Sequence, residues 1–139
     1  MTAKYDLSIN QGANFNIFVQ YLDSSDNPVN LASYTAALQI RRAKETSYPI
    51  LYATTNGVTV GFTGGSGITG GVSGIGGISL NTNYDGSALT GGIYIKVGPS
   101  STAYFPVGRH LYDLDLIIGT TYTNRLLEGR AEVTGETTR

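Results

Sequence analysis

Alternation of apolar and polar side chains with a period of two is the feature that most constrains the fold of this chain. In the last third, Leu114 and Leu116 alternate with aspartates, and Gly119 marks a turn before a second alternating run at residues 122–134. Successive side chains of a β-strand point to opposite faces of the sheet, so this period indicates strands with one buried and one solvated face. We therefore predict a long hairpin over residues 108–134.

The same alternation recurs along most of the chain. Asn56-Gly57 suits the positive φ angles of a tight hairpin turn. Residues 34–42 predict another strand, although a helix over residues 35–44 is an alternative that its alanines and Leu38 would suit. Further short strands are predicted at residues 5–9, 15–21, 50–53, 58–62 and 91–97. Such a series indicates an all-β sandwich or a barrel, and the antiparallel sandwich is favoured because each of its sheets has one wet and one dry face.

Length and composition limit the classes of protein to consider. A chain of 139 residues suits a single domain, residues 1–139, with one core. It contains no cysteine, which excludes disulfides and thiolate metal sites. Nine basic and ten acidic residues leave no broad positive surface, so we expect no nucleic-acid binding. No apolar run follows Lys4 and no stretch approaches the ~18 apolar residues of a membrane helix, so we expect a soluble, unprocessed protein without membrane contact.

A glycine-rich segment, residues 63–92, interrupts this pattern and is predicted to be an insertion or arm. Its first part, residues 63–77, contains eight glycines and no charged residue. A flexible linker would not need apolar side chains at roughly three-residue spacing, so we expect this strip to pack on its own domain or on a neighbouring subunit. The predicted partner-binding residues are Ile68, Val72, Ile75 and Ile78.

Candidate catalytic residues are few. His110 is the only histidine, so a Ser-His-Asp triad or a multi-histidine zinc site would depend on this one residue. Asp113 and Asp115 share one face of a predicted strand, roughly 7 Å apart, within reach of acid and base roles. The wet face of a strand, with Arg125 or Arg130 as partner across the hairpin, explains them better. We therefore expect no enzymatic activity.

Cofactor and metal sites are not expected either. Asp23, Asp26 and Asn27 could offer oxygen atoms to calcium, but their spacing fits a turn better than a six-ligand site. The glycine-rich segment lacks the Gly-Lys-Ser/Thr ending of a phosphate-binding loop. Tyrosine could also stack on sugars, as in a carbohydrate-binding module, although it is common in ordinary strands. The candidate sugar-binding tyrosines are Tyr48, Tyr52, Tyr84 and Tyr104.

Both ends of the chain resemble a family of small virion structural proteins of tailed bacteriophages, including those of cyanobacteria. Residues 5–15, 26–41, 108–116 and 125–134 carry the likeness, which covers both ends of the chain, about two thirds of it, and does not extend over residues 63–92. It implies an immunoglobulin-like β-sandwich, similar to the N-terminal domain of upper baseplate proteins, with the glycine-rich segment as an insertion of this chain's own. The resemblance implies no activity.

Two motifs carry the resemblance. The family's Gln-Gly motif matches Gln11-Gly12, which is followed by Phe15, and its Gly-Arg-Tyr/His-x-Tyr-Asp motif matches residues 108–113. Both look like positions that hold the fold. The resemblance implies a location in the virion, assembled in the host cytoplasm, and contacts with other virion proteins and with further copies of the chain. We expect a capsid decoration or cement subunit bound to the major capsid protein. A tail or baseplate adaptor is the alternative, and a carbohydrate-binding module ranks below it.

Overall fold

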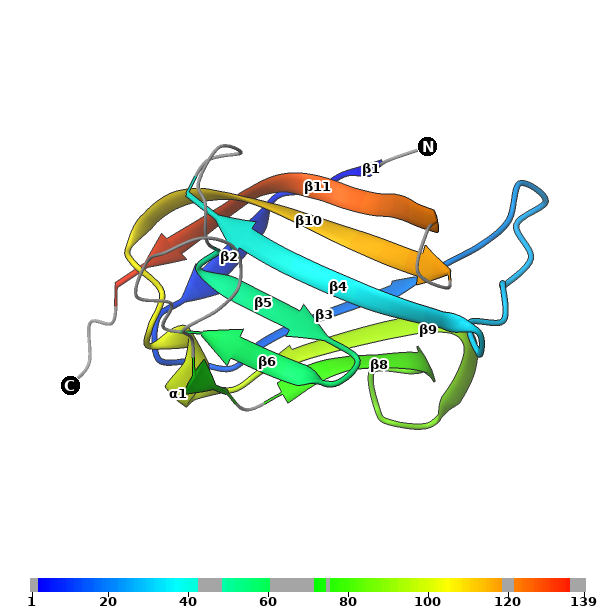
Figure 1. Ribbon diagram of the computed structural model, residues 1–139, viewed down its shortest axis with the longest axis horizontal. Coiled ribbons are helices and arrows are strands. Elements are labelled where there is room, and N and C mark those ends of the chain that lie inside the picture. Colours follow the sequence, from blue (N-terminus) through cyan, green and yellow to red (C-terminus); the bar gives the residue numbers. More distant parts are fainter. Residues whose placement is uncertain (1–2, 43–48, 61–71, 75, 119–121, 136–139) are drawn as a thin grey trace.

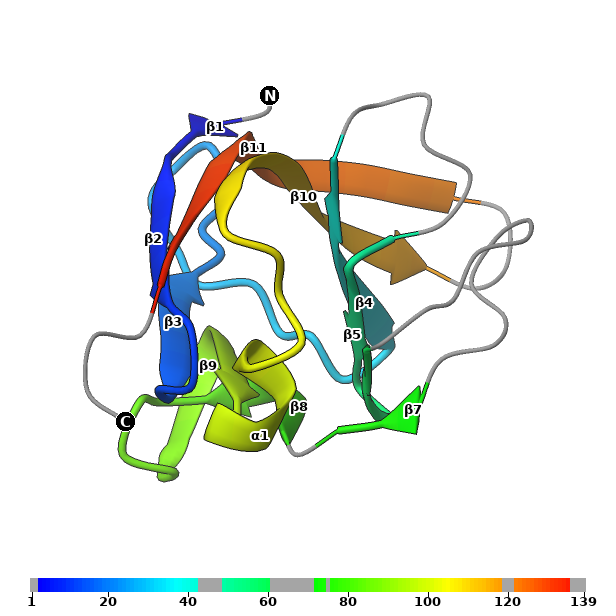
Figure 2. The same ribbon diagram turned by 90° about the vertical axis from the view of Figure 1, so that its left-hand side faces the viewer.

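The computed structural model describes residues 3–42, 49–60, 72–74, 76–118 and 122–135. These residues form two β-sheets that face each other across one hydrophobic core (Figures 1 and 2). The described helical structure is one short helix, α1 (Pro99–Thr102), which follows the smaller sheet. The prediction of an antiparallel sandwich over a barrel is therefore confirmed.

The larger sheet contains eight described strands, and the smaller sheet contains three. The strands of the larger sheet are β1 (Ala3–Lys4), β2 (Leu7–Asn10), β4 (Tyr34–Arg41), β5 (Leu51–Thr54), β6 (Gly57–Val60), β7 (Val72–Ser73), β10 (Gly108–Ile118) and β11 (Tyr122–Thr134). Their order is β1-β11-β10-β4-β5-β6-β7, with β2 also paired to β11. The smaller sheet has the order β3-β9-β8, formed by β3 (Phe15–Gln20), β9 (Ala88–Val97) and β8 (Gly76–Thr82).

The strand order is that of an immunoglobulin-like sandwich. Variable-type immunoglobulin domains extend the three central strands of one sheet by a further hairpin, and a second sheet covers them. Here β11, β10 and β4 are the central strands, β5 and β6 are the added hairpin, and β3-β9-β8 is the covering sheet. The neighbouring strands pair antiparallel, except that β1 and β2 run parallel to β11. The immunoglobulin-like fold is thus carried by connectivity, without the cysteines and tryptophan typical of antibody domains.

Period-two alternation places one face of each sheet in the core. In β10 the buried side chains are His110, Tyr112, Leu114 and Leu116, and the residues between them face outward. The core between the sheets also contains buried aliphatic residues from β2, β4, β5, β6 and β9, including Ile9, Leu38, Ile40, Leu51, Val60, Ile93 and Ile95. Each Å² of apolar surface removed from water stabilises the folded state by about 25 cal/mol, so this core is the main source of stability in a chain without disulfides.

The strands of both predicted hairpins are confirmed, because β10 pairs with β11 and β5 pairs with β6. Tyr34–Arg41 is a strand, not the alternative helix, because it pairs with β10 on one side and with β5 on the other. The turn between β5 and β6 lies at residues 55–56, one position before the predicted Asn56-Gly57 pair; Gly57 has the expected positive φ, 135°, but is the first residue of β6, opposite Thr54. Gly119, the predicted turn of the C-terminal hairpin, lies outside the described residues.

The prediction of an arm over residues 63–92 is wrong for its second half. Residues 76–82 form β8, and β9 begins at Ala88, so both belong to the smaller sheet of the sandwich. The glycines there serve close packing: a Cβ on Gly92 would overlap the carbonyl oxygen of Thr82, and one on Gly76 would overlap that of Lys96. Glycine-rich composition therefore marks close approach of backbones in this segment, rather than a flexible extension.

Candidate interaction surface

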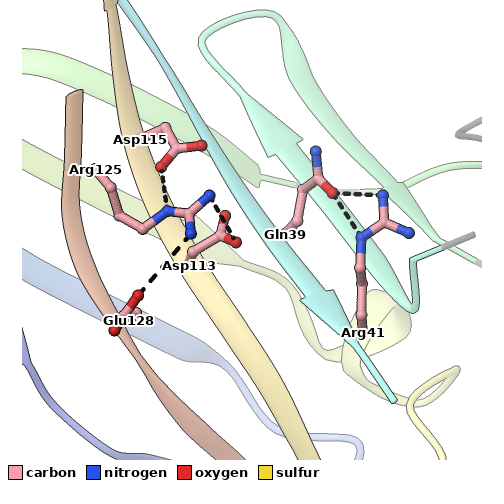
Figure 3. Close-up of polar contacts among 6 residues, drawn as sticks. All are labelled: Gln39, Arg41, Asp113, Asp115, Arg125 and Glu128. Carbon is pink, nitrogen blue, oxygen red and sulfur yellow. Dashed lines mark hydrogen bonds and ion pairs between the residues drawn. The ribbon is translucent and has the colours of Figure 1, made fainter. Parts of the chain in front are cut away.

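The outer face of the larger sheet carries a cluster of charged residues on its two central strands. Asp113 and Asp115 lie on β10, and Arg125 and Glu128 lie on the adjacent strand β11 (Figure 3). The two aspartates project away from the core because alternate residues of β10 face inward, and Arg125 and Glu128 lie beside them on β11. We call these four residues the Arg125 cluster.

Arg125 holds the cluster together. Its Nε lies 3.1 Å from Asp115 Oδ1, and its Nη2 lies 3.5 Å from Asp113 Oδ2. Nη1 lies 3.9 Å from Glu128 Oε1, three residues further along the same strand. The predicted pairing of the two aspartates across the hairpin is therefore confirmed for Arg125. Arg130, the other candidate, lies opposite Leu111 in the register of the hairpin.

A bulge in the hairpin brings Arg125 and Glu128 of β11 to the same face of the sheet. The pairing of β10 with β11 shifts between Leu114 and Asp115, so that Leu114 lies opposite Leu127 but Asp115 lies opposite Arg125. The extra residue, Leu126, lies between Arg125 and Glu128, so these two side chains project to the same face although three positions separate them. A β-bulge redirects side chains in this way by inserting one residue into one strand.

The pKa values of Asp113 and Arg125 are both raised, for different reasons. The pKa of Asp113 is raised, first by burial and then by the charge of Asp115, while Arg125 and Arg41 act in the opposite direction. The pKa of Arg125 is raised, chiefly by its hydrogen bond to Asp115. Both aspartates are thus held against a cation that remains protonated, an arrangement suited to electrostatic recognition rather than to proton transfer.

The cluster borders an open hollow of about 510 Å³. On its other side, β4 contributes Gln39 and Arg41, whose side chains are joined by two hydrogen bonds of 3.0 and 2.7 Å to Gln39 Oε1 (Figure 3). Lys4 and Asp6 from the N-terminal segment complete the rim. Positive and negative groups therefore alternate around one concave surface, which can complement a partner of mixed charge.

His110 and Tyr112 point into the sandwich and tie segments together. Nε2 of His110 lies 2.7 Å from the carbonyl oxygen of Pro106, four residues earlier. The hydroxyl of Tyr112 donates to the carbonyl oxygen of Tyr5, which joins β10 to the N-terminal segment. Burial, followed by the charge of Asp6, raises the pKa of Tyr112 to about 12. Both residues therefore have structural contacts, as the resemblance implied for this motif.

Of the four predicted partner-binding residues, Val72 and Ile78 lie in the described part of the chain. Ile78 is only 4% exposed and belongs to the core, so its prediction as a partner contact is wrong. It lies in β8, whose alternation directs it inward against the larger sheet. Val72 lies in β7 and pairs with Val60. Ile68 and Ile75 lie outside the described residues.

The described residues that were candidates for calcium or sugar binding do not gather at one site. Asp23 Oδ1 accepts hydrogen bonds from the backbone N–H groups of Ser25 and Asn27, which is turn chemistry, as predicted. No group of three potential metal ligands occurs among the described residues. Tyr84 is exposed before the start of β9, and Tyr104 is exposed after the end of α1, which follows β9. Tyr52 lies on β5 of the other sheet. Tyr48 lies outside the described residues.

A second exposed feature was not predicted from the sequence. On the outer face of the smaller sheet, the rings of Phe18 and Tyr84 meet edge to face, with centroids 6.1 Å apart. Phe18 also lies opposite Tyr94 on β9, and Lys96 Nζ lies 5.6 Å from the centroid of the Tyr94 ring. The alternation of residues 15–20 placed Phe18 outward, but its neighbours come from strands whose pairing the sequence did not reveal.

Comparisons with known proteins add little to this description. No family model matches the chain, and none of the curated proteins compared with it does. Among 23 matching chains of solved structures is one from photo-crosslinking analyses of multimeric cell-adhesive interactions of voltage-gated sodium channel β subunits, at 10% identity over 94% of this chain and 92% of that chain, with a TM-score of 0.42. Another is from parallel homodimer structures of the extracellular domains of the sodium channel β4 subunit, at 12% identity over 98% and 95%, with a TM-score of 0.39.

The fold assignment therefore rests on the strand order described above. None of the helices in the described part of the chain is long and apolar enough to cross a membrane.

Proposed function

We propose that this chain is a non-enzymatic structural protein of a bacteriophage virion, incorporated as a decoration or cement subunit of the capsid. The observation that carries the proposal is the position of the segments that resemble the phage family. Residues 5–15, 26–41, 108–116 and 125–134 contain β2, β4 and most of β10 and β11, which are neighbours in the larger sheet. The segments that carry the likeness thus form one continuous part of that sheet. The residues outside them contribute β1, β5 to β9 and most of β3.

The physical properties of the domain suit a subunit that is repeated on a lattice. A decoration subunit stabilises a capsid through many modest contacts, each of roughly 800 Å² per partner, multiplied by the symmetry of the shell. The Arg125 cluster and the hollow beside it offer a surface of mixed charge for such a contact. Mixed charges favour the correct orientation of a partner more than they add affinity.

The test is the position and copy number of the chain in purified particles of a phage that encodes it. Heads and tails are separated, and the chain is quantified by mass spectrometry against the major capsid protein. Many copies in the head fraction, in fixed ratio to that protein, are the expected result. A few copies in the tail fraction would instead support the adaptor, and absence from both fractions would reject a virion role.

The contact surface is tested with particles that lack the chain. Purified wild-type protein is expected to bind them, and R125E, which reverses the central charge of the cluster, is expected to bind at least tenfold more weakly. R109E is the matched control, because Arg109 lies at the far end of the hairpin and is paired only with Glu132 in the described structure. Equal loss for both variants would exclude the Arg125 cluster as the contact.

A further inference from the structure

Strand β3 forms an edge of the smaller sheet that nothing in the described structure covers. It pairs with β9 along its full length, Phe15 to Gln20, and has no described neighbour on its other side (Figure 2). Its sequence, Phe-Asn-Ile-Phe-Val-Gln, contains no charge, proline or glycine. Its pairing with β9 shows no bulge. An edge of this kind is a template for pairing with another strand, and natural proteins normally protect such edges.

The hydrogen-bonding pattern between β3 and β9 shows which residues of β3 direct their backbone N–H and C=O groups away from β9. The N–H of Tyr21 donates to the carbonyl oxygen of Gly91, so Tyr21 and Gly91 are a hydrogen-bonded pair of the antiparallel ladder. Hydrogen-bonded pairs recur at every second residue, so Phe15, Ile17 and Val19 direct their backbone groups toward β9. Asn16, Phe18 and Gln20 therefore direct their N–H and C=O groups outward, where the described structure provides no partner for them.

The other sheet edges of the described structure are short or interrupted. At one edge of the larger sheet, β1 and β2 are two and four residues long and are separated by Tyr5 and Asp6. At its other edge, β7 has two residues. The opposite edge of the smaller sheet, β8, contains Gly76 and Gly77 with positive φ and a register irregularity after Leu80. These are the devices that prevent edge pairing, and β3 has none of them.

We infer that β3 pairs with β3 of a second copy of this chain, antiparallel and centred on Phe18. In this register Phe18 lies opposite Phe18 of the second copy, and Asn16 lies opposite its Gln20. Each outward N–H group then meets an outward C=O group of the other copy, because residues 16, 18 and 20 of both strands form the hydrogen-bonded pairs. The product is one sheet that continues through both molecules, with the order β8-β9-β3-β3-β9-β8.

The side chains of β3 are complementary to themselves in this register, which favours a second copy over an unrelated strand. On the outer face, two phenylalanines meet at the symmetry axis, flanked by pairs of amide side chains. On the inner face, Ile17 lies opposite Val19 of the second copy, and such β-branched pairs are favourable across strands. No like charges meet. A two-fold interface requires that one patch complement itself, and β3 meets this condition.

The aromatic group on the smaller sheet adds apolar surface beside the axis. Phe18 contacts Tyr84 edge to face, and Tyr84 is 66% exposed in the single chain. Pairing through β3 brings the Phe18 and Tyr84 groups of both copies to the same side of the joined sheet. The inference concerns the chain itself and does not depend on whether the proposed virion role is correct.

The experiment measures the oligomeric state of the full chain by sedimentation velocity from about 10 μM to about 1 mM, a range that spans weak and moderate dimers. Wild type is expected to dimerise. F18P removes an outward N–H without touching the ladder to β9 and is expected to be monomeric and folded, as circular dichroism would show. S79K is the matched control, because Ser79 is exposed on the same face but on β8, and is expected to dimerise as wild type does.

Paired charges then test the register. N16K/Q20K and N16E/Q20E each place like charges opposite one another twice and are expected to weaken self-association by about tenfold or more. An equimolar mixture is expected to restore dimers, and N16K/Q20E, in which opposite charges meet, is expected to dimerise at least as well as wild type. Amide hydrogen exchange of Asn16, Phe18 and Gln20 is expected to slow as the protein concentration rises.

Three results would overturn the inference. One is a wild-type chain that remains monomeric up to about 1 mM. Another is a dimer that persists in F18P and in both like-charge variants, because that dimer would use another surface. The third is a mixture of the two like-charge variants that fails to restore association although each variant is folded.

Discussion

Replacing Arg125 with methionine should destabilise the domain more than the same change at Arg109. Arg125 contacts three carboxylates at 3.1, 3.5 and 3.9 Å, and its side chain is 46% exposed. Arg109 contacts Glu132 at 3.3 Å with its side chain 72% exposed. Exposed ion pairs contribute roughly 0.2–1 kcal/mol each, so we expect R125M to lose about 1–2 kcal/mol of unfolding free energy and R109M to lose about 0.5 kcal/mol or less.

The pH dependence provides a second check on the same reasoning. Without Arg125, the folded state loses the cation that stabilises the charged carboxylates, and the pKa of Asp113, which the charge of Arg125 lowers, rises further. The stability contributed by the ion pairs is present while the carboxylates are charged and is lost as they become protonated at acid pH. The difference between wild type and R125M should therefore shrink at acid pH and at high salt.

Urea unfolding of wild type, R125M and R109M at neutral pH, at about pH 3.5 and at high salt measures these differences. The reasoning is refuted if R125M and R109M lose the same free energy at neutral pH. It is also refuted if the loss in R125M is independent of pH, because that result would assign the effect to packing of the aliphatic part of the side chain.

Three further changes test the packing of the sandwich. G92A should cost more than about 2 kcal/mol, because its Cβ would overlap the carbonyl of Thr82, whereas G86A, with open space around its Cβ, should cost about 1 kcal/mol for its positive φ alone, as urea unfolding will show. L38A removes a side chain with no exposed surface and should cost about 2–5 kcal/mol by the same measurement. Tyr112, with its pKa raised to about 12, should be among the last tyrosines to ionise in an ultraviolet titration. Its stabilising effect is complete below about pH 10 and is lost as the pH rises toward its folded pKa, and Y112F should abolish this part of the pH dependence.

The strands and their burial could be predicted from the sequence because alternation is a local property. Leu114 and Leu116 face the core and Asp113 and Asp115 face outward, as their order along the chain requires. The same local rule predicted a turn close to Gly57 and the strand at residues 34–41. Each of these predictions needs only the direction of a side chain relative to its neighbours in sequence.

Pairing between distant segments could not be predicted in this way. The segment around Ile78 was predicted to be part of an insertion or arm because its glycine-rich, uncharged composition differs from that of the strands, yet its close contact with β9 is what makes glycine necessary there. The pairing of the aspartates with Arg125 and not Arg130 depends on the register of the hairpin, and the place of Glu128 beside them depends on a bulge that shifts this register by one residue. Neither feature has a signal in the local pattern.

Alternation in the sequence by itself therefore determined which residues form strands and which side of each strand is apolar, because backbone geometry sets the period of two. Only the tertiary structure decided that β8 and β9 complete the sandwich, that one arginine serves three carboxylates, and that β3 remains at an edge with its outward backbone groups unpaired in the described structure. These features depend on which strands become neighbours, and that choice is made by the packing of the whole core.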